Sequence, residues 1–457
     1  MRFGQADLSF PQFRLCGTDQ GTKFSIPFDL RMHFSLRSIL FTGYTKNGIR
    51  SLFRFHDRPK FRPNARKAAE EVPSGHRWDR TMSHARNISA APCTFKTPRC
   101  QSVPDEDETA DLLESSLGRT TLTVQNLRNI YMKALLLDKG ADYHHLRIGT
   151  TDIPEPAAGE ILVRVQAVGL NPIDYKLTKS GFPTWRFPHI LGLDVAGVVE
   201  KLGVDVDRFT IGDHVMYHGD LSKPGGLAEF AVTTAHMACK LPSTVDFVTG
   251  ASLPCAGLTA YQSLIRRAHL APGQIVLIHA AAGGVGGFAV QIAKHVGGFV
   301  IGTCSEQNQD YVRGLGADAV IDYRRGNLQE AVEDLTAGHG VDLVLESVSR
   351  EQVEDDLELL AFGGTIVSLL GIPRLERLIP FTVSPSIHEV SLGGAHLFGN
   401  RRAQEDLARM GEELLELLRD GTLKPLPIQT FSLEQVPLAL AALEEGHVRG
   451  KLVALID

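Results

Sequence analysis

The chain has 457 residues, of which 43% are hydrophobic and 22% charged, and its formal net charge is −6. This length exceeds what one hydrophobic core usually serves, so we expect a globular enzyme of two domains with a further segment. A membrane span is excluded, because the most apolar window, residues 275–290, contains a histidine and four glycines and falls short of the ~18 apolar residues that a span requires.

Residues 1–131 differ in charge from the rest of the chain. Residues 1–100 carry 18 Lys and Arg against 7 Asp and Glu, whereas residues 132–457 carry 27 against 40. The first 131 residues show no sustained helical or alternating period, and we interpret them as a basic, mostly disordered extension. The alternatives are a transit peptide, a basic arm for nucleic acid, and a start codon set too early, since Met132 begins an apolar run.

Residues 132–253 have the pattern of a mainly β domain. In residues 160–168 (EILVRVQAV), Val163 and Val165 lie on one face while Arg164 and Gln166 lie on the other, as in a half-buried strand. Further short apolar runs, VAGVVEKLG, GDHVMYH and GLAEFAVT, are separated by turn residues.

Residues 254–396 alternate between strands, glycine turns and helices. A continuous apolar run at 275–279 predicts a strand, residues 288–296 predict a helix, and residues 298–303 predict a second strand. Further strands are expected at 319–322, 341–345 and 365–369. Such alternation predicts an α/β domain with a doubly wound parallel sheet covered by helices on both faces.

The last segment, residues 397–457, predicts two helices and a strand. An apolar stripe at helical spacing ends near Gly421 and comprises Leu407, Met410, Leu414, Leu417 and Leu418. Ser432 and Gln435 form a capping box for a second helix that runs to about Gly446. The terminal LVALI is expected to form a strand that rejoins the first domain.

The stretch HAAAGGVGG at 279–287 follows the first strand of the α/β pattern and precedes a helix. Glycines at 283, 284 and 286 allow backbone amides to approach a pyrophosphate, and the helix N-terminus adds partial positive charge. Ala281 stands where the first glycine of the usual dinucleotide motif would be, so a flexible loop is the alternative. The strand and helix around it favour dinucleotide binding.

The end of the second strand bears on the choice between NADPH and NADH. NAD enzymes usually carry an acid there that binds the ribose hydroxyls. This chain has Thr303, Cys304 and Ser305, with Glu306 one position further along. Ser305, with Tyr323 after the next strand, favours NADPH, and Glu306 keeps NADH as the alternative.

The six cysteines, at positions 16, 93, 100, 239, 255 and 304, contain no C-x-x-C pair and no zinc-type spacing with histidine. We therefore expect no metal site. A reducing, cytoplasmic location is the expectation, with the mitochondrion as the alternative if residues 1–131 act as a transit segment.

The chain from 132 to 457 resembles the medium-chain dehydrogenase/reductase superfamily, and within it the zinc-free quinone oxidoreductase or zeta-crystallin-like branch. The motifs that carry the resemblance are GLNPIDYKLTKSG (169–181), PHILGLDVAGVVEKLG (188–203), GD (212–213), GLAEF (226–230), GLTAYQSL (257–264), AAAGGVG (280–286), LGADAVIDYR (315–324) and RGKLV (449–453). The resemblance implies a GroES-like domain, a Rossmann domain and a cleft between them that holds the nicotinamide.

The resemblance also implies roles for single residues. Asn171 would lie near the nicotinamide and the substrate. The positions that would bind the cofactor are Thr259, Gly283, Gly284, Val285, Gly286, Ser305, Tyr323, Gly371 and Lys451. Related enoyl reductases supply a tyrosine where this chain has Phe182, so Tyr175, Lys176 or water would have to provide the product's proton.

Zinc-dependent relatives carry a Cys where this chain has Asn171 and a His-Glu pair where it has Leu193 and Asp194. Asn and Leu cannot replace thiolate and imidazole as zinc ligands. Without a Lewis acid to stabilise an alkoxide, alcohol oxidation is disfavoured, whereas reduction of an electrophilic acceptor remains feasible.

These observations predict an NADPH-dependent oxidoreductase that passes hydride to a small apolar quinone or α,β-unsaturated carbonyl compound without zinc. We expect a homodimer along the edge of the Rossmann sheet, and we expect neither a membrane nor a nucleic acid as partner. The alternative is a crystallin-like or RNA-associated protein that binds NADPH without turnover. The identity of the acceptor cannot be read from the sequence.

Overall fold

The computed structural model describes residues 29–35, 38–44, 50–53, 130–140 and 142–457. Within an N-terminal unit, residues 1–104, β1 (Asp29–Ser35), β2 (Ser38–Tyr44) and β3 (Arg50–Phe53) form an antiparallel sheet. The sequence patterns did not predict these strands. The rest of the extension, with the proposals of a transit segment or a nucleic-acid arm, lies outside the described residues.

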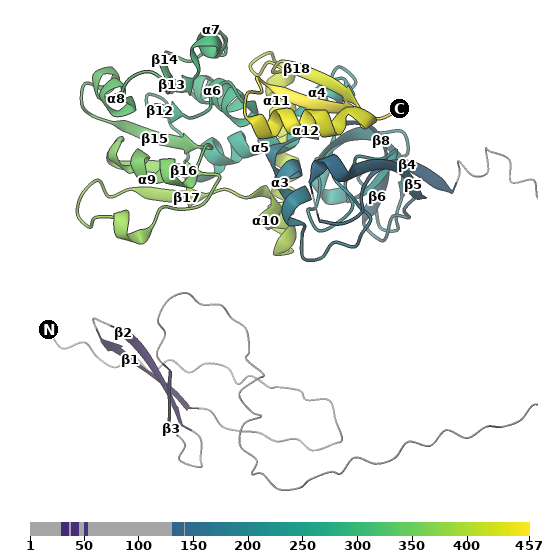
Figure 1. Ribbon diagram of the computed structural model, residues 1–457, viewed down its shortest axis with the longest axis horizontal. Coiled ribbons are helices and arrows are strands. Elements are labelled where there is room, and N and C mark those ends of the chain that lie inside the picture. Colours follow the sequence, from purple (N-terminus) through teal and green to yellow (C-terminus); the bar gives the residue numbers. More distant parts are fainter. Residues whose placement is uncertain (1–28, 36–37, 45–49, 54–129, 141) are drawn as a thin grey trace, which may run out of the picture. The chain divides into compact units, whose positions relative to one another are not determined.

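The remaining unit, from residue 105 onwards, contains two principal sheets (Figure 1). The first is seven-stranded and consists of β6 (Glu160–Leu170), β8 (Asp194–Leu202), β9 (His214–His218), β10 (Phe230–Thr234), β11 (Cys239–Lys240), β18 (Ile428–Ser432) and β19 (Lys451–Leu455). A smaller sheet is formed by β4 (Tyr131–Leu137), β5 (Leu146–Asp152) and β7 (His189–Ile190). These sheets confirm the mainly β GroES-like part of the fold.

The last strand returns to this β part, as expected. β19 pairs antiparallel with β6, and Leu452 lies opposite Leu170. In Figure 1 the yellow C-terminal elements accordingly lie beside the blue strands. The elements that precede β19 are α11 (Arg401–Arg419), η7 (Leu433–Gln435), which begins at the predicted capping box, and α12 (Val436–Glu445).

The second principal sheet has six strands that are all parallel: β12 (Ile275–Ile278), β13 (Phe299–Cys304), β14 (Ala319–Asp322), β15 (Val341–Glu346), β16 (Leu360–Ser368) and β17 (Ser386–Glu389). Their spatial order is β14-β13-β12-β15-β16-β17, the doubly wound order of dinucleotide-binding sheets. This sheet confirms the Rossmann part of the fold.

Helices cover both faces of the parallel sheet. The buried side chains of β12 alternate, with Val276 and Ile278 in one core cluster and Leu277 in another. The first cluster includes residues of α5 (Pro254–Tyr261), α6 (Gly284–Val296) and α11, and the second includes residues of α8 (Leu328–Thr336) and α9 (Arg350–Asp355). The alternation is therefore a period-two pattern with both faces buried, as parallel sheets require.

The other helical segments are α3 (Pro172–Ser180), α4 (Phe247–Ser252), the π-helical η3 (Gln262–Arg267), α7 (Gln309–Gly314) and α10 (Leu392–Leu397), with short 3₁₀ turns η1 (Tyr143–His145), η2 (Ala235–Met237), η4 (Glu306–Asn308), η5 (Asp356–Glu358) and η6 (Leu375–Arg377). Within the described residues, no helix is both long and apolar enough to cross a bilayer.

Two predicted boundaries were wrong. The helix expected from residue 288 begins at Gly284, because the glycines lie in its first turn and allow it to pack closely on the preceding loop. The strand expected at 365–369 begins at Leu360 and contains Gly363, whose φ of +78° accompanies a shift of register between Val341 and Leu343 on β15. A glycine pair that resembles a turn is here an irregularity inside a strand.

Candidate functional site

The glycine loop connects the central strand of the parallel sheet to α6. Gly283 is the N-cap of α6, and its backbone N–H donates to the carbonyl of Ala280 at 2.9 Å. A Cβ on Gly286 would lie 2.3 Å from that same carbonyl oxygen, so no side chain fits there. The first amides of α6, which include those of Gly284 and Val285, have no acceptor within the helix. They form a cradle that suits a pyrophosphate.

The start of β19 packs directly on this loop. The backbone N–H of Gly450 donates to the carbonyl of Ala282 at 3.1 Å. A Cβ on Gly284 would lie 3.1 Å from Cδ of Lys451. The aliphatic stem of Lys451 therefore passes along the first turn of α6, and its ammonium group lies beyond the loop.

The Lys451 ammonium group reaches Asn171. The resemblance places both residues near the cofactor, and that role stays a prediction. Lys451 Nζ donates to Asn171 Oδ1 at 2.5 Å and to the carbonyl of Leu170 at 3.2 Å. Asn171 Nδ2 donates to Asp194 Oδ2 at 2.8 Å and to the carbonyl of Gly169 at 3.3 Å. Both polar atoms of the Asn171 amide are thus engaged, so its orientation is fixed by the protein.

Two buried aspartates complete this network, and the sequence analysis did not select either as a functional residue. Asp174 Oδ2 accepts from the backbone N–H of Asn171 at 2.8 Å. Burial raises the pKa of Asp174 to about 7 and that of Asp194 to about 6, although Lys451 lowers both. The signal for Asp174 was the Asn-x-x-Asp spacing at a helix start, which is a capping pattern.

Tyr175 and Lys176 lie one turn further along α3. Tyr175 is half-buried against the core of the β part, and Lys176 is exposed with Nζ 6.0 Å from the Tyr175 ring centre. Within the described residues, neither side chain hydrogen-bonds to Asn171 or Lys451. Their role as proton donors stays a prediction.

The residues expected at the adenosine end meet at the edge of the parallel sheet. β13 and β14 are neighbours with Cys304 opposite Asp322, so Ser305 and Tyr323 leave the sheet side by side. Ser305 is buried and its Oγ accepts from Asn308 Nδ2 at 3.2 Å. Tyr323 is 56% exposed.

Two arginines and an acid surround this edge. The Arg324 guanidinium lies 5.3 Å from the Tyr323 ring centre. Arg325 Nη2 donates to Glu306 Oε2 at 2.5 Å. The acid that kept NADH as an alternative is therefore paired with a cation, a contact that the sequence analysis did not foresee.

Thr259 and Gly371 occupy separate elements. Thr259 is buried in α5, which packs against α6. Gly371 lies three residues after β16 with a φ of +117°, a conformation that L side chains rarely adopt. Their roles at the nicotinamide end stay predictions.

A cluster of possible metal ligands lies beside Asn171. Asp194, His218 and Cys255 place a carboxylate oxygen, an imidazole nitrogen and a thiol within 4.8 Å of one another. These donor types suit zinc, and the spacing of cysteines and histidines had not predicted this cluster.

The surroundings of the cluster fit zinc poorly. Asp194 Oδ1 accepts from the backbone N–H of Cys255 at 2.9 Å, and Oδ2 accepts from Asn171 while lying 3.8 Å from Lys451 Nζ. The fixed ammonium group opposes a second cation. Burial also raises the pKa of the Cys255 thiol, which disfavours the thiolate form in the absence of a metal ion.

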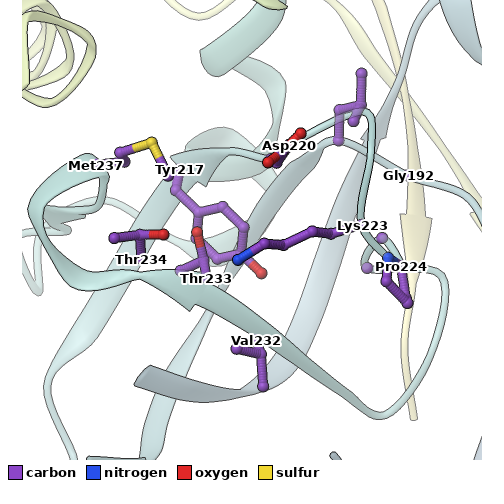
Figure 2. Close-up of a pocket in the computed structure, with 13 residues that line it drawn as sticks. Gly192, Tyr217, Asp220, Lys223, Pro224, Val232, Thr233, Thr234 and Met237 are labelled. Atoms are coloured by element: carbon purple, nitrogen blue, oxygen red, sulfur yellow. The ribbon is translucent and has the colours of Figure 1, made fainter. Parts of the chain in front are cut away.

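A small pocket opens within the β part (Figure 2). Figure 2 shows Tyr217, Lys223 and Thr233 among its lining side chains. The Tyr217 hydroxyl is buried and has no hydrogen-bond partner among the described residues, whereas Lys223 Nζ donates to Glu160 Oε1 at 2.6 Å. No residue of the glycine loop lines this pocket, so it is distinct from that loop.

Comparison with known proteins agrees with the parallel sheet, the glycine loop and the β part. Residues 157–243 match the alcohol dehydrogenase GroES-like domain, and residues 315–453 match the zinc-binding dehydrogenase family. The quinone oxidoreductase of Pongo abelii is 32% identical over 308 residues, which cover 66% of this chain and 91% of that protein. The chain therefore belongs to the medium-chain dehydrogenase/reductase superfamily, among the relatives of quinone oxidoreductases.

Solved structures show the same likeness. A quinone oxidoreductase from Pseudomonas syringae superposes with a TM-score of 0.65 at 30% identity, covering 71% of this chain and 100% of that one. The CurK enoyl reductase superposes with a TM-score of 0.63 at 27% identity, covering 72% and 99% respectively. The chain is thus an oxidoreductase of the class that resembles both quinone oxidoreductases and enoyl reductases.

Proposed function

We propose that the chain is an NADPH-dependent reductase that passes hydride to a quinone or an α,β-unsaturated carbonyl compound without zinc. The observation that carries this proposal is the glycine cradle at α6, which lies directly beside the buried Lys451 and Asn171 pair. The similarity to quinone oxidoreductases and to an enoyl reductase supports the class of acceptor.

The residues at the adenosine end support NADPH over NADH. Ser305 offers a hydroxyl, and Arg324 and Arg325 offer guanidinium groups beside it, which are suitable donors to a 2′-phosphate. The pairing of Glu306 with Arg325 reduces the repulsion that a free carboxylate would exert on that phosphate. When bound, the reduced nicotinamide supplies the hydride.

The chain's own residues would prepare the acceptor by orientation and charge. Quinones and enones delocalise incoming negative charge, so the protein needs mainly to align the acceptor and to place positive charge or a hydrogen-bond donor near its oxygen. The Lys451 ammonium group, fixed by Asn171 and Leu170, provides such a charge. Tyr175, Lys176 or water would supply the proton.

Zinc independence is proposed from the donor set. Asn171 and Leu193 stand where zinc-dependent relatives carry ligands, and Lys451 lies 3.8 Å from the remaining carboxylate, Asp194. Metal analysis of the purified full chain tests this part separately. Stoichiometric zinc that is lost in Cys255→Ser would contradict it.

The activity itself is tested by NADPH oxidation at 340 nm with panels of quinones and enones, with NADH side by side. We expect turnover with at least one acceptor and a preference for NADPH. Binding of NADPH with no turnover on any acceptor would favour the non-catalytic alternative, which the complete engagement of the Asn171 amide also fits. If neither NADPH nor NADH bound, both the reductase proposal and the non-catalytic alternative would be refuted.

We propose a homodimer formed along the edge strand β17 of the parallel sheet. β17 lies at the end of the strand order, and the preceding segment exposes Ile379 and Phe381 at 67% and 102%. An exposed edge strand with apolar neighbours favours pairing with a second copy. A monomeric mass by light scattering at micromolar concentration would refute this proposal.

A further inference from the structure

Three buried side chains that the proposed reaction does not use meet at the carboxyl edge of the parallel sheet. His279 follows β12, Glu346 ends β15, and Asp356 begins η5. β12 and β15 are adjacent with Ile278 opposite Leu345, so the first two side chains leave the sheet at the same edge. The three are 4%, 0% and 0% exposed. They form what we call the buried triad.

The imidazole of His279 lies between two carboxylates and a hydroxyl. Its Nε2 is 3.0 Å from Asp356 Oδ1 and 3.7 Å from Glu346 Oε2. Its Nδ1 is 3.2 Å from Thr303 Oγ1. Because only acceptors flank Nε2, this nitrogen carries a hydrogen. The hydroxyl of Thr303 can accept from Nδ1 when the ring is doubly protonated.

Two oxygens of the triad lack partners. Glu346 Oε1 accepts from the backbone N–H of Ser349 at 2.8 Å, and Asp356 Oδ1 accepts from Gln352 Nε2 at 3.0 Å as well as from His279. Glu346 Oε2 and Asp356 Oδ2 have no hydrogen-bond partner within the described residues. Buried carboxylate oxygens without partners are costly. A proton shared within the triad lowers this cost.

The charges and the burial of the triad favour the protonated forms of two of its side chains, His279 and Glu346. In the part of the chain that the structure describes, no Lys or Arg forms an ion pair with either carboxylate, so only these two acids face His279. Burial lowers the pKa of His279, but the hydrogen bond and charge of Asp356 and the charge of Glu346 outweigh it and raise the pKa overall. Burial raises the pKa of Glu346. The raised pKa values of His279 and Glu346 both favour retention of protons within the triad.

The triad is attached directly to the glycine loop. The backbone N–H of His279 donates to the carbonyl of Leu345 at 3.1 Å, and that of Ala281 donates to the carbonyl of Thr303 at 2.9 Å. Between them, Ala280 has a φ of +47°, a left-handed conformation that costs energy for a residue with a side chain. The loop's first residues are thus held on one side by His279 and on the other by Thr303.

We propose that His279, Asp356 and Glu346 are positioning residues that, by sharing protons between them, hold the glycine loop in the conformation that binds a pyrophosphate. This inference rests on the proposed function of that loop. A raised pKa in the folded protein means that the support is complete below the ordinary His pKa of about 6.5 and is lost as pH rises through the raised value. NADPH affinity should fall over the same range.

The test is the NADPH dissociation constant of the full chain between pH 7 and 9.5, where the 2′-phosphate, with a pKa of about 6, stays ionised. We expect affinity to fall as pH rises in the wild-type protein. Asp356→Asn should weaken binding about tenfold at pH 7 and abolish the pH step. Glu346→Gln removes one of the two acids that raise the pKa of His279, so it should move the pH step to lower pH. Ser305→Ala serves as the matched control, because it should weaken binding equally at every pH.

A second measurement keeps the inference testable if Asp356→Asn fails to fold. In histidine-labelled wild-type protein, the imidazole resonance assigned by its loss in His279→Gln should titrate above the ordinary His pKa of about 6.5. A His279 that titrates at or below this ordinary pKa, an unchanged pH step in folded Asp356→Asn, or a stoichiometric metal ion that this variant loses would each overturn the inference. If neither coenzyme binds at all, the proposed function fails, and the resonance still reports the state of the triad.

Discussion

The buried carboxyl of Asp174 should make the stability of the protein depend on pH in a way that one substitution removes. Asp174 is 1% exposed in α3, and its Oδ2 accepts from the backbone N–H of Asn171. Burial, helped by the charge of Asp194, raises its pKa to about 7, while Asn171 and Lys451 act in the opposite direction. The change to make is Asp174→Asn, which keeps the shape and removes the titrating group.

The sign and size follow from linkage. Because the folded-state pKa lies above the unfolded value of about 3.9, the folded state of Asp174 binds its proton more tightly, and stability falls as pH rises through about 7. One pKa unit corresponds to about 1.4 kcal/mol, so the part of the shift that lies between pH 5 and pH 8 amounts to roughly 2–3 kcal/mol. The wild-type protein should lose about this much from Asp174 alone, and Asp174→Asn should not.

The assay is equilibrium urea unfolding of wild-type protein and Asp174→Asn at pH 5 and pH 8. For each protein, the unfolding free energy at pH 8 is subtracted from that at pH 5. Comparing this change between the two proteins cancels the contributions of the other titrating groups. Asp152→Asn, at the exposed end of β5, is the control. Its unfolding free energy should change with pH as that of the wild type does. If Asp174→Asn showed the same pH dependence as the wild type, Asp174 would ionise near its ordinary pKa, and the reasoning about burial would be refuted.

Three further substitutions test the cofactor cradle and its neighbours. Gly286→Ala should raise the NADPH dissociation constant by about tenfold or more, because its Cβ would lie 2.3 Å from the Ala280 carbonyl oxygen. A Cβ on Gly283 would lie 3.3 Å from its nearest atom, so Gly283→Ala should have a smaller effect in the same fluorescence titration. Glu306→Gln should increase the preference for NADPH over NADH by about threefold by freeing Arg325; equal changes for both coenzymes would contradict this. Lys451→Met should lower the unfolding free energy by about 3–5 kcal/mol above pH 7, because Asp194 loses its buried cation. A loss of unfolding free energy under about 1 kcal/mol would refute the pairing of Lys451 with Asp194.

The sequence predicted the order of the elements well because the signals were local. The continuous apolar runs of β12 and β15 and the capping box at Ser432 each depend on neighbouring residues only. The glycine loop was found for the same reason, since strand, turn and helix follow one another in the chain. The limits of the predicted domains, 132–253, 254–396 and 397–457, stay predictions.

Contacts between distant residues could not be read from the sequence. The Glu306–Arg325 pair requires two loops from adjacent strands, and the His279–Asp356 contact spans 77 residues. Parallel strands bring their carboxyl ends together only once their spatial order is known. The sequence therefore identified the glycine loop but not the charges around it, and the phosphate-binding role of the loop stays a prediction.

The return of the chain to its first sheet explains why the candidate site needs the whole fold. β19 pairs with β6, so residues 170 and 452 become neighbours although they are far apart in sequence. That pairing fixes Gly450 against the carbonyl of Ala282 on the glycine loop, and it carries the Lys451 ammonium group to Asn171. One strand thus connects the glycine loop, the proposed coenzyme cradle, with the polar network beside it. Any movement of the parallel sheet relative to the β part must strain or break these same few contacts, so coenzyme binding and the state of the Asn171–Asp194–Lys451 network should be coupled.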